Sequence, residues 1–265
     1  MRLDIRMPGG KEFFFFPDTK GPSPTSPYCN AECIGCISYQ RPGKCSITQP
    51  RIKFTPSAEE VAEAALYHIR NTKDPVVSYG QGCEGEPLLA EKVIEKSIRL
   101  IRRSTAKAVI NMNTNASRPQ AIARLFDAGL DSIRVSLNSA REHYYTRYYK
   151  PKGYRYGDVI ESIKIAKRKG GFVSINYLTM PGFTDSKGEF AALLRLIEKC
   201  DIDMIQWRNL NFDPLRYFKA LGVSDGNSGL LGIREVIRRT KRMYPKVMMG
   251  YFNPSRARIR RIRGA

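Results

Sequence analysis

The sequence predicts an α/β fold in which parallel strands alternate with helices that pack outside the sheet. Short apolar runs recur between segments of helical spacing from about residue 55 to residue 245. Such alternation forms a parallel sheet, because each helix carries the chain back to the start of the next strand. A doubly wound sheet and a barrel both fit this pattern. A count of six strands suits a partial (β/α)6 TIM-like barrel.

The strands are predicted from short apolar runs bounded by polar or turn residues. The first run, Phe13–Phe16, is far too short to cross a membrane and suits a buried strand. Further strands are expected at 75–79, 108–112, 132–137, 172–177 and 204–207, with a terminal strand near 247–251.

The helices are predicted from apolar residues at helical spacing and from their end signals. Ser57 and Glu60 have the spacing of a capping box. Ser117 is expected to cap another helix, and Gly129 to end it. Residues 141–156 interrupt the pattern and are predicted to form a long loop. Helices are expected after Ser57, over 89–103, after Ser117, over 157–169, over 189–199 and near 230–243.

Length and composition fit one barrel-sized domain. The chain has 265 residues, of which 42% are hydrophobic, so a substantial core can be buried. We expect the barrel to occupy residues 1–250 and residues 251–265 to form a basic, arginine-rich tail. Neither a membrane span nor an export signal is apparent. These features favour a cytoplasmic location without a membrane partner, where cysteines stay reduced.

The chain is strongly basic, with 45 Lys and Arg against 25 Asp and Glu and a net charge of +20. A field of this sign attracts polyanions such as nucleic acids. Residues 256–263 carry five arginines in eight positions. Other basic residues are spread over the predicted helices, which is equally typical of a solvated surface. A nucleic-acid partner and a merely basic surface are therefore both compatible with the composition.

Three cysteines, Cys29, Cys33 and Cys36, lie close together in a Pro/Ser/Gly-rich stretch. Thiolates at this spacing can converge on one metal centre. A [4Fe–4S] cluster normally takes four thiolates, and no fourth lies at matching spacing, so one iron would be open for chemistry. A zinc site completed by Cys45, or unrelated thiols, are the alternatives. Disulfides fit poorly in a chain of this length without an export signal.

The spacing Cys-x3-Cys-x2-Cys near the start of an α/β chain resembles the radical S-adenosylmethionine (radical SAM) superfamily. The resemblance implies a partial barrel, a [4Fe–4S] cluster held by Cys29, Cys33 and Cys36, and S-adenosylmethionine (SAM) bound at the open iron. In barrels of this type the active site lies at the carboxyl ends of the strands. The residues that follow each strand are therefore the candidates for contacts with SAM.

The segment after the second predicted strand resembles the superfamily's Gly-Gly-Glu segment, which binds the amino group of the SAM methionine. Glu84 stands where that pattern has its first glycine. An ordinary glycine-rich turn is the alternative. The residues that match are Gly85, Glu86 and Pro87.

Polar residues after the later strands complete the SAM site that the resemblance implies. Asn113 belongs to a segment similar to a Thr-Asn-Gly turn at the barrel mouth. Ser136 and Asn138 are expected to contact SAM, with the serine near the methionine carboxylate or the ribose. Asn176 is expected near the ribose, and Arg208 near a carboxylate of SAM or substrate.

The resemblance implies an enzyme that cleaves SAM reductively at the cluster and yields a 5′-deoxyadenosyl radical for hydrogen abstraction. A reductant of the flavodoxin or ferredoxin type is then needed. Cys83 is a candidate hydrogen-atom donor, with a buried inert thiol as the alternative. The substrate is open between an RNA or nucleotide-like molecule and a protein or peptide. A non-catalytic iron–sulfur or zinc protein is the alternative of a different class.

Overall fold

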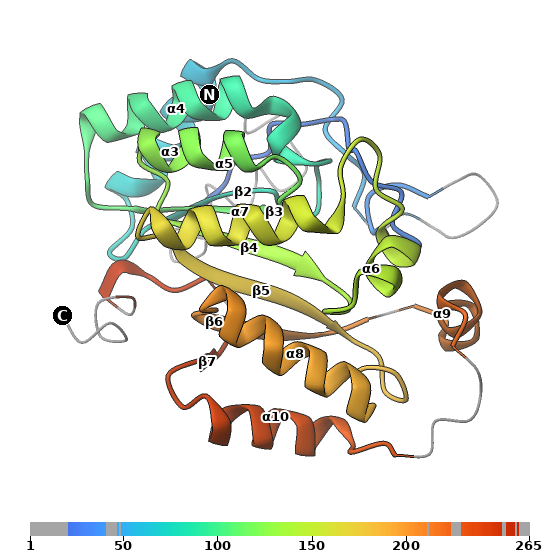
Figure 1. Cartoon of the computed structure of the whole chain (residues 1–265). Helices are drawn as coiled ribbons and strands as arrows, with labels where there is room; N and C mark the ends of the chain where they lie inside the picture. Colours follow the sequence, from blue (N-terminus) through green and yellow to red (C-terminus); the bar gives the residue numbers. More distant parts are fainter. Residues whose placement is uncertain are drawn as a thin grey trace.

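In the computed structural model, the described strands form one sheet of seven parallel strands in the order β1-β2-β3-β4-β5-β6-β7 (Figure 1). Each described neighbouring pair is parallel, which confirms the predicted α/β class. The strands are β1 (Gly21–Pro22), β2 (Val76–Tyr79), β3 (Val109–Thr114), β4 (Ser132–Leu137), β5 (Phe172–Thr179), β6 (Met204–Asn209) and β7 (Met248–Met249). The structure describes residues 21–40, 47, 49–210, 212–223, 229–250, 253–257 and 259.

The helices largely follow the predicted pattern. The capping box at Ser57 and Glu60 is confirmed, with both reciprocal hydrogen bonds present. Gly129 ends its helix in the left-handed conformation, at φ 113°, as expected. The described helices are α3 (Ala58–Arg70), the short 3-10 helix η1 (Pro87–Ala90), α4 (Glu91–Ser104), α5 (Pro119–Ala128), α6 (Glu142–Tyr149), α7 (Tyr156–Arg168), α8 (Lys187–Cys200), α9 (Pro214–Leu221) and α10 (Ile233–Met243).

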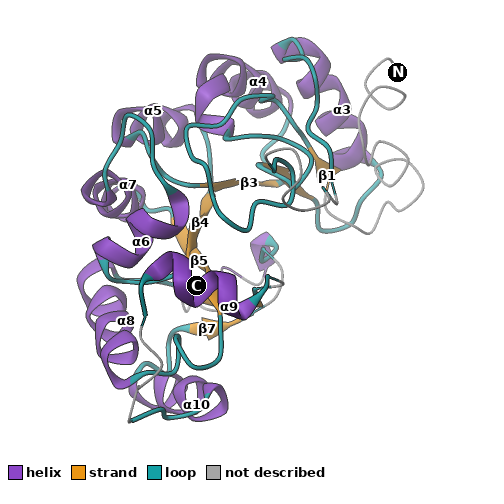
Figure 2. Ribbon diagram, turned by 90° about the vertical axis from the view of Figure 1, so that its right-hand side faces the viewer, coloured by secondary structure: helices purple, strands orange, loops and turns teal. Residues whose placement is uncertain are grey.

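The sheet is curved and open, in agreement with the predicted TIM-like architecture. Figure 2 shows the strands as an inner arc, with α3, α4, α5, α7, α8 and α10 outside it. Within the described residues, β1 and β7 are the two edges of the sheet and do not pair with each other. Helices α6 and α9 contact each other near the carboxyl ends of the strands.

The strands predicted between residues 75 and 207 are confirmed as β2 to β6, and the terminal strand is confirmed as β7. The predicted strand Phe13–Phe16 lies outside the described residues. The edge strand at Gly21–Pro22 was not predicted, since a proline-rich segment gives no strand pattern. Proline lacks an amide hydrogen and is tolerated at a sheet edge, where no partner needs that donor.

Two local predictions were wrong. Residues 141–156 were predicted as a loop, but they contain helix α6 and the start of α7. The buried side chains of α6, Tyr145, Tyr148 and Tyr149, recur at helical spacing, which outweighs the polar residues between them. Ser117 does not cap α5, because the helix begins with a proline two residues later; the Ser117 hydroxyl instead accepts a hydrogen bond from Asn30.

The two faces of the sheet differ in polarity. Alternate residues such as Ile110, Ile133 and Ile175 belong to the apolar core shared with the outer helices. The residues between them line the concave face, and most of them are polar. There the Asn111 amide donates to Ser78 Oγ at 2.9 Å and accepts from Ser132 Oγ at 2.9 Å. A polar concave face is suited to binding polar ligands rather than to filling a barrel with apolar side chains.

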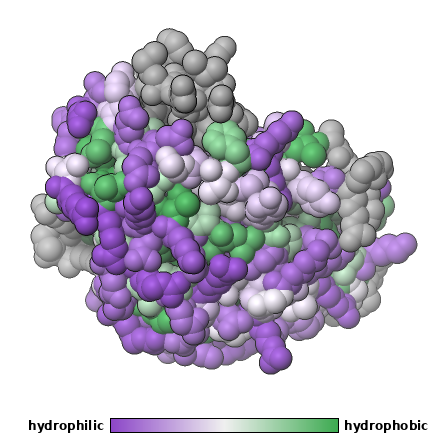
Figure 3. Space-filling view, turned by 90° about the horizontal axis from the view of Figure 1, so that it is seen from above, coloured by the Kyte–Doolittle hydropathy of each residue, from purple (hydrophilic) through white to green (hydrophobic). Residues whose placement is uncertain are grey.

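The face drawn in Figure 3 is largely hydrophilic, and its apolar residues are scattered between polar ones without forming a continuous band. Among the helices of the described residues, none is both long enough and apolar enough to pass through a membrane.

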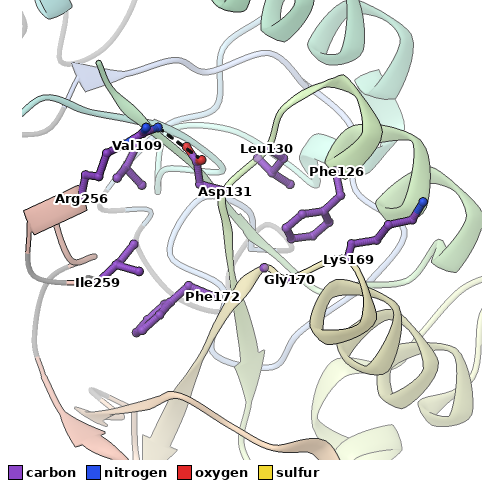
Figure 4. Close-up of a pocket in the computed structure, with 10 residues that line it drawn as sticks. Val109, Phe126, Leu130, Asp131, Lys169, Gly170, Phe172, Arg256 and Ile259 are labelled. Carbon is purple, nitrogen blue, oxygen red and sulfur yellow. Dashed lines mark ion pairs between the residues drawn. The ribbon is translucent and has the colours of Figure 1, made fainter. Parts of the chain in front are cut away.

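The C-terminal segment covers the amino ends of the central strands. Asn253 approaches the side chains of Ser78 and Asn113 at 3.5 Å on the concave face. Arg256 donates to the carbonyl of Ala108 at 3.2 Å, just before β3. A cavity of about 290 Å³ lies beside this segment, between α5, α7 and Arg256 (Figure 4). It lies at the amino ends of β3 to β5, whereas barrel active sites lie at the carboxyl ends.

We expect Asp131→Ala to lower the free energy of unfolding by about 1–3 kcal/mol. The Asp131 carboxylate accepts a hydrogen bond from Ile110 N at 2.7 Å and forms ion pairs with Arg102 and Arg256, so its loss leaves partly buried donors unsatisfied. Urea unfolding measures the change. Asp127→Ala is the control, because the Asp127 pair with Lys169 is exposed, and a change below about 0.5 kcal/mol is expected. Equal losses in both variants would contradict the prediction.

Candidate functional site

The cysteine loop, residues 23–40, runs from the end of β1 along the carboxyl ends of the sheet. Cys29, Cys33 and Cys36 are partly buried and have free thiols. The cysteine segment has no helix or ladder strand of its own, and a single antiparallel bridge joins Ala31 to Pro151. The position of the three sulfurs therefore depends on contacts with the loops that follow β2, β3 and β4.

The first contact is made with the loop after β2. Gly85 N donates to Ser26 O at 2.6 Å, and Glu86 N donates to Tyr28 O at 2.7 Å. A Cβ atom at Gly85 would collide with the carbonyl oxygen of Tyr28, so only glycine allows this close approach. The predicted SAM-binding segment consequently lies directly beside Cys29.

Glu84 forms the second contact and is almost completely buried, with 3% of its surface exposed. One carboxylate oxygen accepts from Thr25 N at 2.8 Å and from Ser26 N at 3.0 Å. The other accepts from the amides of Gly80 at 2.5 Å and Gln81 at 3.2 Å. One side chain thus joins the start of the cysteine loop to the turn that ends β2. In the sequence, Glu84 stood out only as a departure from the family pattern. No basic residue lies next to it in the sequence, and this is the signal that could have indicated a carboxylate bound by backbone amides.

Glu86 is similarly buried and connects the same loop to the end of β3. Its carboxylate accepts from the Thr114 hydroxyl, from Asn115 N at 2.8 Å and from Leu88 N at 3.1 Å. A carboxylate offers about four acceptor positions, so the protein fills three of them and leaves one. The predicted contact between Glu86 and the ammonium of SAM is therefore limited to that one remaining position.

The loop after β3 holds the residue that follows Cys29. Asn115 donates to the side-chain oxygen of Asn30 at 2.7 Å, and Asn30 donates to Ser117 Oγ at 2.9 Å. Both hydrogen-bonding ends of the Asn30 amide are satisfied by this one loop. Neither Asn30 nor Ser117 was predicted to belong to the site, because their contact joins distant parts of the sequence.

Helix α6 supplies the fourth contact. Glu32 N donates to Tyr149 O at 3.0 Å, and Ile34 N donates to Tyr148 O at 3.1 Å. The last carbonyls of a helix have no partner within the helix, so they can accept these donors. A Cβ atom at Gly35 would lie 2.8 Å from the Tyr148 hydroxyl oxygen, which shows how closely the loop packs on the helix.

The site favours different protonation states for its acidic groups. Burial raises the pKa of Glu84 and of Glu86 to about 7 against the opposing effect of their hydrogen bonds. Burial also raises the pKa of Cys29 to about 11 and that of Cys33 well above its usual value. For Cys36, burial is outweighed by hydrogen bonds from Ser38 and by the charge of Arg51, so its pKa is lowered. Metal binding needs thiolates and would release these protons.

The other predicted SAM contacts lie on or next to the concave face. Ser136 and Asn176 are register partners on β4 and β5, and Arg208 lies on the same face near the end of β6. Asn113 is engaged within the sheet, where it donates to Gly80 O at 3.0 Å. Asn138 is fully buried and its amide lies 3.3 Å from the Tyr217 hydroxyl of α9, so it holds α6 and α9 at the mouth.

Two further predicted residues lie within the loop after β2. Pro87 begins the 3-10 helix η1, for which Glu86 is the N-cap. Cys83 is buried and its carbonyl accepts from Ile52 N at 2.8 Å, which brings the chain around residue 51 back to the cysteine loop.

The donor set fits an iron–sulfur cluster. Among the residues that the structure describes, no three Cys, His, Asp or Glu side chains meet closely enough to share one metal ion. A [4Fe–4S] cluster does not require this, since each thiolate ligates a different iron. The three thiols are partly buried and lie on one short loop, so each can ligate a separate iron of the same cluster. Cys45, the fourth ligand of the zinc alternative, lies outside the described residues.

Comparison with known proteins identifies relatives for most of the chain. The sequence profile of the Radical SAM superfamily matches residues 23–196. The FeMo cofactor biosynthesis protein NifB of Klebsiella pneumoniae is 25% identical over 178 residues, which cover 62% of this chain and 37% of that protein. A probable GTP 3′,8-cyclase of Thermococcus kodakarensis is 33% identical over 124 residues, which cover 43% of this chain and 38% of that protein. The match thus spans less than two fifths of either relative.

A solved structure shares the fold. A radical SAM methyltransferase from Sphaerobacter thermophilus superposes with a TM-score of 0.60 at 15% sequence identity, over 91% of this chain and 68% of that chain. At this level of identity the match supports the architecture of the sheet and its outer helices, and nothing about substrate.

We expect Glu84→Gln to destabilise the protein by about 1–3 kcal/mol, because an amide NH2 would face backbone donors that now meet a carboxylate oxygen. A carboxyl group whose folded pKa is raised stabilises the fold at acid pH and loses that effect as the pH rises through about 7. The difference in unfolding free energy between the wild type and the variant should therefore be larger at pH 5 than at pH 8. Urea unfolding at the two pH values measures it.

Glu63→Gln, on the exposed side of α3, is the matched control and should leave stability nearly unchanged at both pH values. A difference for Glu84→Gln that is constant with pH, or that grows toward pH 8, would contradict the raised pKa.

Proposed function

Because the chain belongs to the Radical SAM superfamily, we propose that it is an enzyme that binds a [4Fe–4S] cluster and SAM at the carboxyl edge of its sheet. The observation that carries this proposal is the contact between the cysteine loop and the segment of Gly85 and Glu86. The hydrogen bond from Glu86 N to Tyr28 O, at 2.7 Å, sets these two segments side by side. This arrangement supports cluster binding and SAM binding at adjoining positions.

In this proposal each part of the site has a separate task. Cys29, Cys33 and Cys36 ligate the cluster, which when bound supplies the electron for reductive cleavage of SAM to a 5′-deoxyadenosyl radical that takes a hydrogen atom from substrate. The backbone at Gly85 and the free acceptor position of Glu86 orient the amino group of SAM. The residues proposed to contact the rest of SAM are Pro87, Asn113, Ser136, Asn138, Asn176 and Arg208.

The surroundings support a dry site. Tyr145, Tyr148 and Tyr149 are buried behind the cysteine loop, and the rings of Tyr145 and Tyr149 stack at 4.5 Å. Exclusion of water protects a reactive radical from quenching. The buried thiol of Cys83 is a candidate hydrogen-atom donor in this proposal.

The electron is proposed to come from a reductant of the flavodoxin or ferredoxin type, in the cytoplasm, where thiols stay reduced.

The proposed substrate is an RNA or a nucleotide-like molecule, with a protein or peptide as the alternative. The net charge of +20 supports an anionic partner. One relative is named as a GTP cyclase, which supports a nucleotide, although the match covers 38% of that protein. We further propose that residues 1–250 form the catalytic barrel and residues 251–265 a basic tail. In the tail, Arg256 is 3.6 Å from Asp131 and is therefore part of the fold as well.

We expect Cys33→Ala to abolish 5′-deoxyadenosine formation, because two thiolates should not hold a cluster with one open iron. Anaerobic reconstitution followed by iron analysis, visible spectra and a dithionite-driven SAM cleavage assay tests this. Cys200→Ala is the control, since Cys200 is buried in α8 away from the cysteine loop, and it should retain activity.

Full 5′-deoxyadenosine formation by Cys33→Ala would overturn the cluster assignment. A colourless wild-type protein that holds zinc would overturn the proposed function as a whole.

We expect replacement of Arg260, Arg261 and Arg263 by glutamine to weaken RNA binding and to make it less dependent on salt. The slope of log affinity against log salt should fall by roughly one unit for each phosphate group that an arginine no longer neutralises. These three arginines are chosen because the Arg256 contacts with the fold stay intact. Filter binding to single-stranded RNA at several salt concentrations measures the slope. Unchanged affinity and slope would exclude the tail from nucleic-acid binding.

A further inference from the structure

Arg51 lies outside the cysteine motif in the sequence but beside it in space. Its Nη2 atom is 3.7 Å from Cys36 Sγ, and its Nε atom donates to Ser38 Oγ at 3.0 Å. The family resemblance gave no reason to consider this residue. The contact places a positively charged guanidinium next to one of the three candidate cluster ligands.

Several contacts fix the orientation of this guanidinium. Ser38 Oγ lies 3.3 Å from the carbonyl oxygen of Glu84, so the group that receives the Arg51 hydrogen bond is itself anchored to the β2 loop. The guanidinium carbon lies 5.2 Å from the centre of the Tyr39 ring, within the range of a cation–π contact. The next residue, Ile52, is held by the carbonyl of Cys83 at 2.8 Å. Arg51 is therefore positioned rather than freely rotating.

The charge of Arg51 reaches the cysteine loop directly at Cys36, across the 3.7 Å between Nη2 and Sγ. Within the described residues, no carboxylate forms an ion pair with Arg51.

We propose that Arg51 raises the reduction potential of the [4Fe–4S] cluster through its charge and its hydrogen bond to Cys36. The proposal rests on the proposed function, in which the three cysteines hold that cluster. Reduction adds one electron to a centre that already carries three thiolates, so a nearby cation stabilises the reduced state more than the oxidised state. Hydrogen bonds to the sulfurs and the net charge around them are established determinants of cluster potential. Arg51 thus makes the one-electron reduction that precedes SAM cleavage easier, and it is a positioning and tuning residue.

The test is a redox titration of the anaerobically reconstituted full-length protein, followed by electron paramagnetic resonance, first without SAM and then with it. We expect Arg51→Gln to lower the equilibrium constant for reduction at least tenfold, which is a fall of about 59 mV for one electron. Arg51→Lys keeps the charge and should shift the equilibrium constant by less than about threefold. A matched control is Arg99→Gln on α4, whose guanidinium is bound to Glu95 at the surface, and it should leave the potential unchanged.

An unchanged midpoint in Arg51→Gln, at unchanged iron content, would overturn the proposal. An equally large fall in Arg51→Lys would also overturn it, because charge would then not be the cause. A shift found only in the presence of SAM would assign Arg51 to SAM binding and would likewise overturn it. If Arg51→Gln does not retain its cluster, Tyr39→Leu decides, since it removes the cation–π contact that orients the guanidinium and leaves the charge and the Ser38 hydroxyl in place. A lowered midpoint then supports the proposal and an unchanged one overturns it.

The outcomes for the cluster and for Arg51 are separable. A wild-type protein without a [4Fe–4S] signal defeats the proposed function. A wild-type protein that holds the cluster and cleaves SAM, with variants of equal potential, defeats the role of Arg51 alone.

Discussion

The hydrogen bonds of two buried carboxylates determine where the cysteine loop can lie. Glu84 and Glu86 are separated by one residue and bind the loop start and the end of β3, respectively. A loop without regular secondary structure has no hydrogen-bond ladder of its own to fix the positions of three sulfurs. The hydrogen bonds of the two carboxylates supply this fixation instead. The carboxylate oxygens accept hydrogen bonds from backbone N–H groups. An acidic side chain can be buried when its oxygens are paired in this way. The cluster site, the SAM segment and the mouth of the sheet all depend on this arrangement.

The site gathers several acidic groups within a strongly basic protein. Two carboxyl groups and three thiols meet within a chain of net charge +20. The donors that contact these acidic groups are mostly backbone amides and one guanidinium, rather than the abundant surface lysines. Burial accounts for this difference. Long basic side chains on the outer helices are solvated and screened, whereas fixed dipoles inside the loop act over short distances in a medium of low polarity.

Much of the fold and part of the site could be predicted from the sequence. The parallel sheet and the capping box at Ser57 follow from local patterns. Helix α6 was not predicted because its pairs of tyrosines are separated by polar residues and a proline follows shortly after them. The roles of Glu84 and Arg51 depend on contacts between segments far apart in the chain, and neither periodicity nor spacing encodes such contacts. The cysteine spacing therefore located the centre of the site, while its supporting residues needed the structure.

The C-terminal segment makes the two halves of the concave face unequal. Asn253 lies against Ser78 and Asn113, the next-to-last residues of β2 and β3, which are buried, whereas Ser136 and Asn176 on β4 and β5 remain partly exposed. A ligand on the concave face therefore meets accessible side chains on β4 and β5, while the matching positions on β2 and β3 are already engaged by contacts within the protein.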